Sequence, residues 1–212
     1  MSGDHLRRSG RLGLAIAAGL ALFALTGAAT DAKIETPADL RGKHVAHMSS
    51  DFHKRELKAL QPDVVFDPYS EYAFAIESLR NGKIAAISIG KTYADMWTAR
   101  YPGEFRIAFE YAEDVCCFLL PKNAGLKSEF DAELRKLDSE GALDAVRDRW
   151  IEAVKAGKTL EPPPSTAPAD ARALRVACAA GSEPWCLVAN GKVVGIDMEI
   201  LTLVANRLGY RL

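Results

Sequence analysis

The stretch VVFDPYSEYAFAIESLRNGKIAAISI, residues 64–89, decides the fold class of this 212-residue chain. It begins with an apolar segment, Val64 to Phe66, which is typical of a strand. Ser70 precedes apolar residues at helical spacing, and Gly82 is placed to end that helix. Residues 84–89 read as a buried strand. Strands that alternate with helices in this way predict an α/β fold with a parallel or mixed sheet.

The alternation continues on both sides of this stretch. Thr36 and Asp39 mark a helix start. Further strands are predicted at residues 44–48, 105–109, 115–120, 174–178 and 193–196, and further helices at 52–60, 92–100, 129–137, 142–154 and 198–208, the last capped by Asp197.

Residues 1–30 have the order of a secretory signal peptide. Arg7, Arg8 and Arg11 precede the apolar run LGLAIAAGLALFAL, and small residues follow it. We expect cleavage between Ala28 and Ala32, no lipid anchor and a periplasmic location. The competing interpretation is an uncleaved membrane anchor, but the uncharged stretch is barely long enough to span a bilayer.

The remaining chain divides at a Pro-rich segment. Residues 33–154 form the main predicted region, in which residues 33–111 make one complete lobe. Residues 155–171 contain three consecutive prolines and predict an extended linker. Residues 172–212 start a new unit that is too short to make its own core, so it must pack on another part of this chain or on another chain.

The composition excludes several classes of function. Basic and acidic residues number 27 and 28, for a net charge of −1, which argues against a nucleic-acid binder. The chain has no Gly-rich phosphate loop, nucleophile elbow or C-x-x-C pair. We therefore expect neither an enzyme nor a cofactor.

The histidines and cysteines each leave a question open. His44, His47 and His53 lie close in sequence, but residues 44 and 47 face opposite sides of a strand, so no metal site is expected. These histidines would be the acid–base candidates if the chain were an enzyme. Cys178 and Cys186 bracket a short loop, and a disulfide between them is possible in an exported protein.

Two loops are candidates for binding a ligand. Each follows a predicted strand and precedes a helix, where free backbone N–H groups attract carboxylates. The first contains Ser49, Ser50 and Asp51, and the second contains Gly90, Lys91 and Thr92. The alternative to a role in binding is that Ser50, Asp51 and Thr92 only cap the helices. Trp185 is either a platform for a ligand or a core residue.

The chain resembles the bacterial extracellular solute-binding proteins of family three, the amino-acid-type receptors of ABC importers. Pro184-Trp185, Asn190 to Asp197 and Arg207-Leu208-Gly209 match the opening of that family. The later part is matched by Asp39 to Lys43, Phe66-Asp67, Asn81-Gly82-Lys83 and Gly141 to Trp150.

This resemblance implies periplasmic-binding-protein-like (type II) lobes, one complete and one partial. It implies a small amino acid or related carboxylate bound in an interlobe cleft, and a permease as partner. Glu183 and Trp185 would serve from one lobe, and the two candidate loops from the other. Lys91 stands beside the position of the family's ammonium-binding aspartate, which favours a carboxylate without an α-amino group.

The order of the matched segments departs from the family, because the opening segment follows the closing one. Either the chain is a truncated remnant of tandem receptor domains, or it is permuted, with residues 172–212 folded back onto residues 115–154. The hypotheses that compete with a receptor are a membrane-anchored sensor or partner-docking module, a dehydratase-like enzyme, and a fragment without function.

Overall fold

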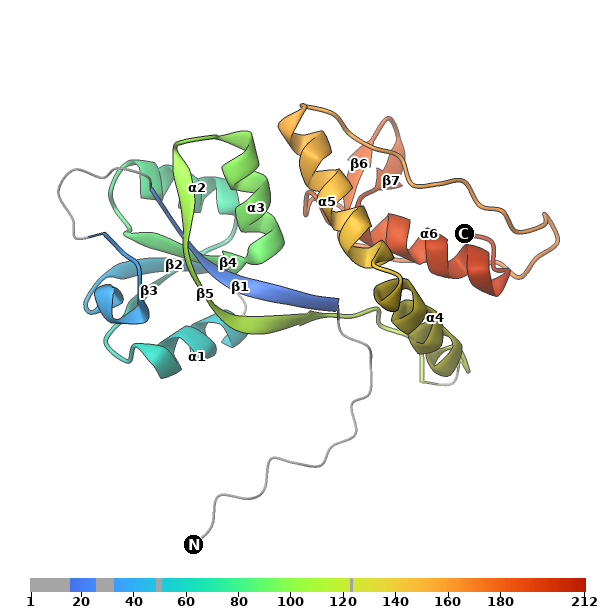
Figure 1. The fold of residues 1–212 in the computed structure, drawn as a ribbon, viewed down its shortest axis with the longest axis horizontal. Coiled ribbons are helices and arrows are strands. Elements are labelled where there is room, and N and C mark those ends of the chain that lie inside the picture. The colour runs from blue at the N-terminus through green and yellow to red at the C-terminus, as the bar shows by residue number, and fades with distance from the viewer. Residues whose placement is uncertain (1–15, 26–32, 49–50, 123) are drawn as a thin grey trace, which may run out of the picture.

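The computed structural model describes residues 16–25, 33–48, 51–122 and 124–212. They form two units that lie side by side (Figure 1). The first, which we call the sheet unit, takes in the described residues up to 116. The second, the helical unit, is built from residues 124–212. Within the described residues no helix is both long and apolar enough to cross a membrane.

The sheet unit contains five strands in the order β3-β2-β4-β1-β5. β2 (His44–Met48) pairs in parallel with β3 (Val65–Tyr69) and with β4 (Ala86–Gly90). β1 (Ile16–Leu25) lies antiparallel between β4 and β5 (Phe105–Cys116). The sheet is therefore mixed, as the alternation of strands and helices predicts.

Helices cover both faces of this sheet (Figure 1). The 3-10 helix η1 (Pro37–Leu40) and α1 (Asp51–Leu60) pack on one face, and α2 (Tyr72–Arg80) and α3 (Lys91–Arg100) pack on the other. On the face covered by α2 and α3, the rings of Phe23 and Phe105 pack together, with their centroids 4.8 Å apart. Leu22, on the opposite face of the same strand, packs with Leu57.

β1 falls inside the segment that the sequence predicts to be a signal peptide. Leu20, Ala21, Leu22 and Phe23 are fully buried, so these residues belong to the core of the folded chain. A strand buried on both faces shows no alternation, and its apolar run looks like the centre of a signal. The expected cleavage site, between Ala28 and Ala32, lies outside the described part of the chain, so cleavage stays a prediction.

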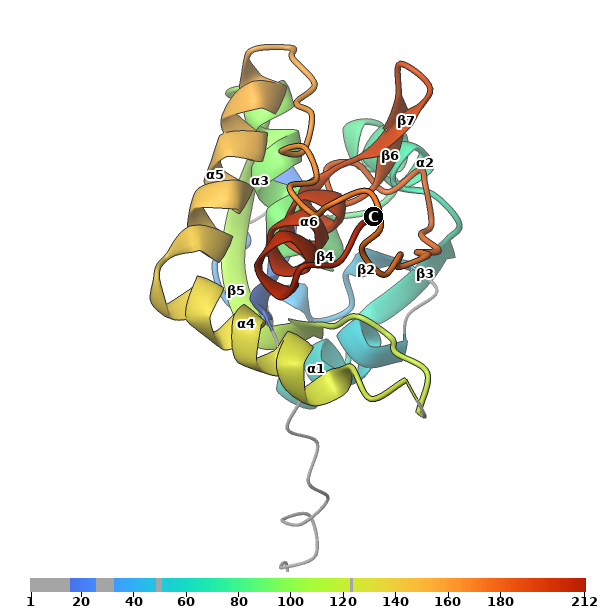
Figure 2. The ribbon, with the colours of Figure 1, turned by 90° about the vertical axis from the view of Figure 1, so that its right-hand side faces the viewer.

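The helical unit packs the end of the chain onto the helices that follow the sheet (Figure 2). α4 (Lys127–Ser139), α5 (Ala142–Lys155) and α6 (Ile196–Leu208) share one apolar core, to which the hairpin of β6 (Leu187–Ala189) and β7 (Lys192–Val194) is joined. This is the packing that the permuted account requires, and it gives the short C-terminal unit the core that it cannot make alone.

Polar contacts fix α6 in this position. The indole N–H of Trp150 donates to the buried carboxylate of Glu199 over 2.9 Å, and Arg149 pairs with the same carboxylate. The hydroxyl of Tyr210 donates to Glu129 over 2.7 Å. Glu199 is therefore buried with partners, which is the condition for keeping a charge inside a core.

Three predicted strands and one predicted helix cap differ in the structure. Residues 174–178 form no strand, and the ladder contact beside them is an isolated bridge between Ala173 and Arg211. The two strands expected at 105–109 and 115–120 are replaced by one strand, β5, which ends at Cys116 and pairs with β1 along its length except at two register shifts. The N-cap of α6 is Gly195, and Asp197 lies inside the first turn.

Two local expectations concern helix caps. Ser70 does not cap α2, whose N-cap is Glu71. The helix start at Thr36 is confirmed, because a carboxylate oxygen of Asp39 accepts from the Thr36 backbone N–H over 2.8 Å and from its hydroxyl over 2.9 Å.

Replacing Phe23 by alanine tests whether β1 supports the core. We expect Phe23→Ala to lower the free energy of unfolding of the full chain by about 3–5 kcal/mol, because a large buried ring leaves a cavity. Urea denaturation measures this. Leu119→Ala is the control, since Leu119 is 93% exposed and its change should stay within about 0.5 kcal/mol. Equal stabilities for the two variants would contradict the buried position of β1.

Candidate functional site

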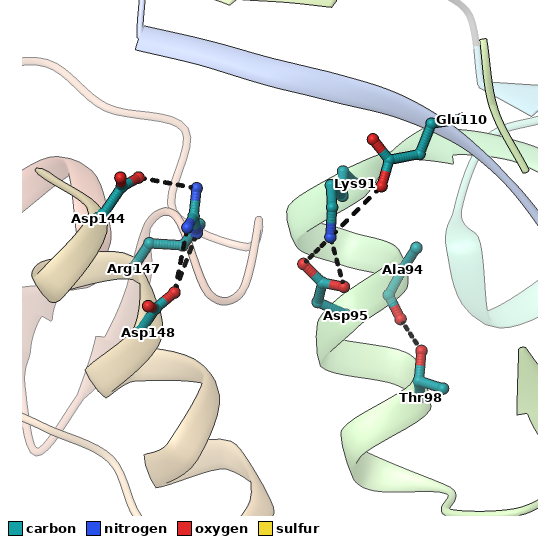
Figure 3. A network of polar contacts seen from close by, with 8 residues as sticks. All are labelled: Lys91, Ala94, Asp95, Thr98, Glu110, Asp144, Arg147 and Asp148. Carbon is teal, nitrogen blue, oxygen red and sulfur yellow. Dashed lines mark hydrogen bonds and ion pairs between the residues drawn. The ribbon is translucent and has the colours of Figure 1, made fainter. Parts of the chain in front are cut away.

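The predicted loop Gly90-Lys91-Thr92 lies where β4 meets α3, with Gly90 as the N-cap of the helix. Thr92 is buried, at 3% exposure. The ammonium of Lys91 lies 3.0 Å from a carboxylate oxygen of Asp95 and 3.7 Å from one of Glu110 (Figure 3). The positive charge that the sequence offers to a ligand is therefore already compensated by two acids of the sheet unit.

A second cation is held in the same way on α5. Figure 3 shows the guanidinium of Arg147 between Asp144, at 3.1 Å, and Asp148, at 3.2 Å. These two networks consist mainly of neighbours along a helix, which are common on solvated faces and contribute a few tenths of a kcal/mol each. They do not form a ligand site by themselves.

Glu183 lies at the other end of α3. Its carboxylate pairs with Arg100 over 2.8 Å and joins the two units there. Arg100 stands at the last position of α3 and Lys91 at the first, a separation of about 14 Å along the helix axis. Glu183 and Lys91 are thus too far apart to hold one small ligand together.

The first predicted loop is only partly described. Ser49 and Ser50 lie outside the described residues, and Asp51 is the first residue of α1. Their role in binding stays a prediction.

A large cavity lies between the two units. Its volume is about 1060 Å³, just above the usual range of about 300–1,000 Å³ for small-molecule pockets. Tyr93 of α3 and Cys116 of β5 contribute from the sheet unit, and the loop around Trp185 and the start of α6 contribute from the helical unit. The cavity is thus an interlobe space. Among the described residues predicted to bind a ligand, Trp185 is the one that lines it.

The polar end of this cavity gathers Tyr93, Ser182 and Asp197. Burial raises the pKa of Asp197 to about 6, above the usual 3.8. Burial also raises the pKa of Tyr93, as do the nearby Asp197 and Cys116, while a hydrogen bond with Ser182 lowers it. A partly buried carboxylate beside a tyrosine hydroxyl can accept hydrogen bonds from a cationic or N–H group of a ligand.

The rest of the lining combines apolar side chains with two arginines. Phe118, Leu120, Phe130 and Leu174 supply apolar walls, and Arg172 and Arg175 line the same cavity. The guanidinium of Arg172 also lies 5.7 Å from the centre of the Tyr210 ring. Guanidinium groups bind carboxylates through paired hydrogen bonds. The cavity therefore has an acid and two arginines, which can bind the two charges of a zwitterion, and it also has an apolar wall.

The position of Trp185 depends on a glycine. Gly195 has φ +132°, and a Cβ at that position would lie 2.2 Å from the backbone oxygen of Trp185. Only glycine allows this approach. The same oxygen accepts from the backbone N–H of Asp197 over 3.0 Å, so the tryptophan loop and the start of α6 are fixed to each other. The side chain of Trp185 also packs on the core of the helical unit.

Cys178 and Cys186 both line the cavity as free thiols. Burial, together with a hydrogen bond to the Cys178 thiol, raises the pKa of Cys186 to about 12. The two sulfurs are therefore neighbours, although the disulfide remains a prediction.

The three histidines are separate from this cavity. His44 bonds Asp67 over 2.9 Å on the surface, and the ring of His47 bonds the backbone oxygen of Met48 over 2.7 Å. His53 is buried in α1. In the described part of the chain no group of three His, Cys, Asp or Glu side chains could hold a metal ion.

Sequence reasoning missed most of the cavity lining. Tyr93 directly follows the predicted loop, and Asp197 ends the stretch Asn190 to Asp197, but its sequence position suggests only a helix cap. Arg172 and Arg175 follow the Pro-rich segment without any motif. Their proximity depends on the folding of residues 172–212 onto α4 and α5, which no local pattern encodes.

The architecture is that of the type II periplasmic-binding-protein lobes, an α/β fold present here with one partial lobe. Three solved structures share it. The first is an amino-acid ABC transporter substrate-binding protein of Streptococcus pneumoniae bound to L-arginine, with a TM-score of 0.52 and 21% identity over 66% of this chain and 58% of that one. The second is the GluR0 ligand-binding core with L-glutamate, with a TM-score of 0.56 and 18% identity over 64% of this chain and 60% of that one. The third is an ancestral arginine-binding protein bound to arginine, with a TM-score of 0.52 and 20% identity over 63% of this chain and 60% of that one.

Among curated proteins, the chain is 24% identical over 124 residues to the ABC transporter arginine-binding protein 1 of Escherichia coli strain K12, covering 55% of this chain and 51% of that protein. The resemblance to the amino-acid-type solute-binding proteins is confirmed. The chain spans about half the length of the curated relative that it matches. No family model matches it.

The raised pKa of Asp197 makes stability depend on pH. An acid whose pKa is higher in the folded state contributes stability that is complete below pH 3.8 and is lost as the pH rises through about 6. Asp197→Asn removes this loss. We expect the variant to gain up to about 3 kcal/mol over the parent at pH 7.5, and no more than about 1 kcal/mol at pH 4.5, in urea denaturation.

Asp144→Asn is the matched control, because Asp144 also lies in the first turn of a helix but its side chain is 73% exposed. It should show no such gain. A gain of Asp197→Asn that is the same at both pH values would contradict the burial of this carboxylate.

Proposed function

We propose that this protein is a solute-binding protein of an ABC importer and that it binds an amino acid in the cavity between its two units. The observation that carries the proposal is the composition of that cavity, in which Asp197, two arginines and an apolar wall face one space of about 1060 Å³. The similarity to amino-acid substrate-binding proteins supports the same role.

The cavity narrows the class of amino acid. An α-carboxylate would pair with Arg172 or Arg175, and an α-ammonium would bind beside Asp197 and Tyr93. Ionisation of Asp197 is disfavoured by burial, and a cationic ligand would restore its charged form. The apolar walls that include Phe118 favour a large apolar side chain. The sequence position of Lys91 favours a carboxylate without an amino group as the ligand. We propose an amino acid instead, because Asp95 and Glu110 already compensate the charge of Lys91.

The location and partner follow from this role. We propose a periplasmic protein that is exported through its N-terminal segment and that delivers its ligand to a permease in the inner membrane. The proteins similar to it are binding proteins, which supports a role without catalysis.

Thermal melts of the full chain test the proposal. The probes are phenylalanine and leucine, their deaminated analogues, and arginine. We expect the apolar amino acids to raise the melting temperature in a concentration-dependent manner, because a ligand that binds only the folded state stabilises it. The deaminated analogues should give a smaller increase, since they lose the contact with Asp197.

Arg175→Ala should reduce the increase caused by phenylalanine. Arg135→Ala is the matched control, because Arg135 is exposed on α4 and away from the cavity lining. An increase with arginine alone would contradict the apolar specificity, and no response to any of these probes would contradict the binding function.

The neighbouring thiols give a separate prediction. We expect Cys178 and Cys186 to form a disulfide in protein exported to an oxidising compartment, because they are close and the loop between them is short. Alkylation followed by mass spectrometry, with and without prior reduction, measures this. Two free thiols in exported protein would contradict the bridge.

A further inference from the structure

β1 is the element that joins β5 to the rest of the sheet. It pairs on one edge with β4, with Leu20 opposite Gly90 and Phe23 opposite Ile87. On its other edge it pairs with β5 from Ile16 opposite Cys116 to Leu25 opposite Phe105, with two register shifts along the way. Among the described strands β5 has no other neighbour in the sheet.

β1 is also enclosed on both faces. Ala21 and Phe23 pack under α2 and α3 with Phe105, whereas Leu22 and Ala24 pack with Leu40 on the side of α1. The strand therefore contributes to both core layers at once. Its surroundings form a groove with two hydrogen-bonding edges and two apolar walls.

This groove holds its strand by contacts that need no covalent link. Extended peptides bind at sheet edges through main-chain hydrogen bonds, while pockets for alternate side chains give specificity. Here both edges and both faces are used, so each residue between Leu20 and Phe23 is fully buried. The strand pairs and core contacts of β1 are made with residues that follow Lys33 in the chain, where the description resumes after Leu25.

We propose that the space between β4 and β5 is a binding groove for one apolar antiparallel strand, and that residues 16–25 occupy it as a non-covalent ligand that stays bound after the chain is cut between Leu25 and Lys33. Specificity comes from Leu22 and Phe23, which fill opposite walls. The proposal does not depend on the solute that the cavity binds.

The groove gives residues 16–25 two incompatible roles. The same apolar residues are predicted to act in export, and a strand that is buried on both faces is not available to an export receptor. Recognition of the segment for export must therefore precede folding, and the folded full chain hides it.

A cut in the full chain tests the proposal. Residues 26–32 are replaced by the recognition sequence of a specific protease, the folded protein is cleaved, and the products are separated by gel filtration. We expect the N-terminal fragment to elute with the rest of the chain. The cut protein should also melt at a temperature that rises with protein concentration, as a two-part complex requires, whereas the uncut protein should not.

Variants of Leu22 measure the specificity of the groove. Leu22→Ala should weaken retention of the fragment by at least about 30-fold, equivalent to about 2 kcal/mol. Leu22→Asp should release it, because a carboxylate would be buried without a partner. Leu119→Asp is the matched control at a side chain that is 93% exposed, and it should leave retention unchanged.

Separate elution of the unmutated fragment overturns the proposal, whether the remaining chain keeps the melting transition of the uncut protein or loses it. Retention that is equal in the parent and in Leu22→Ala overturns the assigned specificity. The result on the unmutated protein does not depend on whether any variant folds.

Discussion

The sheet depends on the pairing of β1 with two strands that do not pair with each other. β4 belongs to the parallel part of the sheet and β5 leads to the helical unit, so the antiparallel strand between them joins β5 to the parallel strands. Residues 20–24 of β1 are apolar because both faces are buried. This constraint places the end of β5, and with it the wall of the cavity that Cys116 contributes.

α3 has a second structural role, since it lies between the sheet and the helical unit. It packs against α5, as Figures 1 and 2 both show. Arg100 at its end pairs with Glu183, and Tyr93 near its start bonds Ser182. Both partners belong to the loop before Trp185. The two units are therefore joined by contacts at both ends of one helix, and the contact between Tyr93 and Ser182 lies at the cavity.

Local sequence patterns predict most helices and the parallel strands. The strand His44–Met48 has its predicted bounds, and the helices of residues 92–100 and 142–154 differ only by a residue at one end. The patterns fail where a contact is distant in sequence. An apolar run gives no signal for the partner it will bury against, so β1 resembles a membrane-directed segment. Lys91 looks free in the sequence, and only the fold brings Glu110 beside it. Asp197 looks like a helix cap in the sequence, and only the fold shows the burial that raises its pKa.

Amide hydrogen exchange on the full chain tests the central claim, that residues 16–25 are a strand of the folded protein. Exchange reports the opening free energy of each segment, and core strands exchange only through large or global opening. The account predicts that backbone amides of residues 20–24 are protected as strongly as those of β4 and of the paired part of β5. Rapid exchange in residues 20–24, together with strong protection in β4, would contradict it.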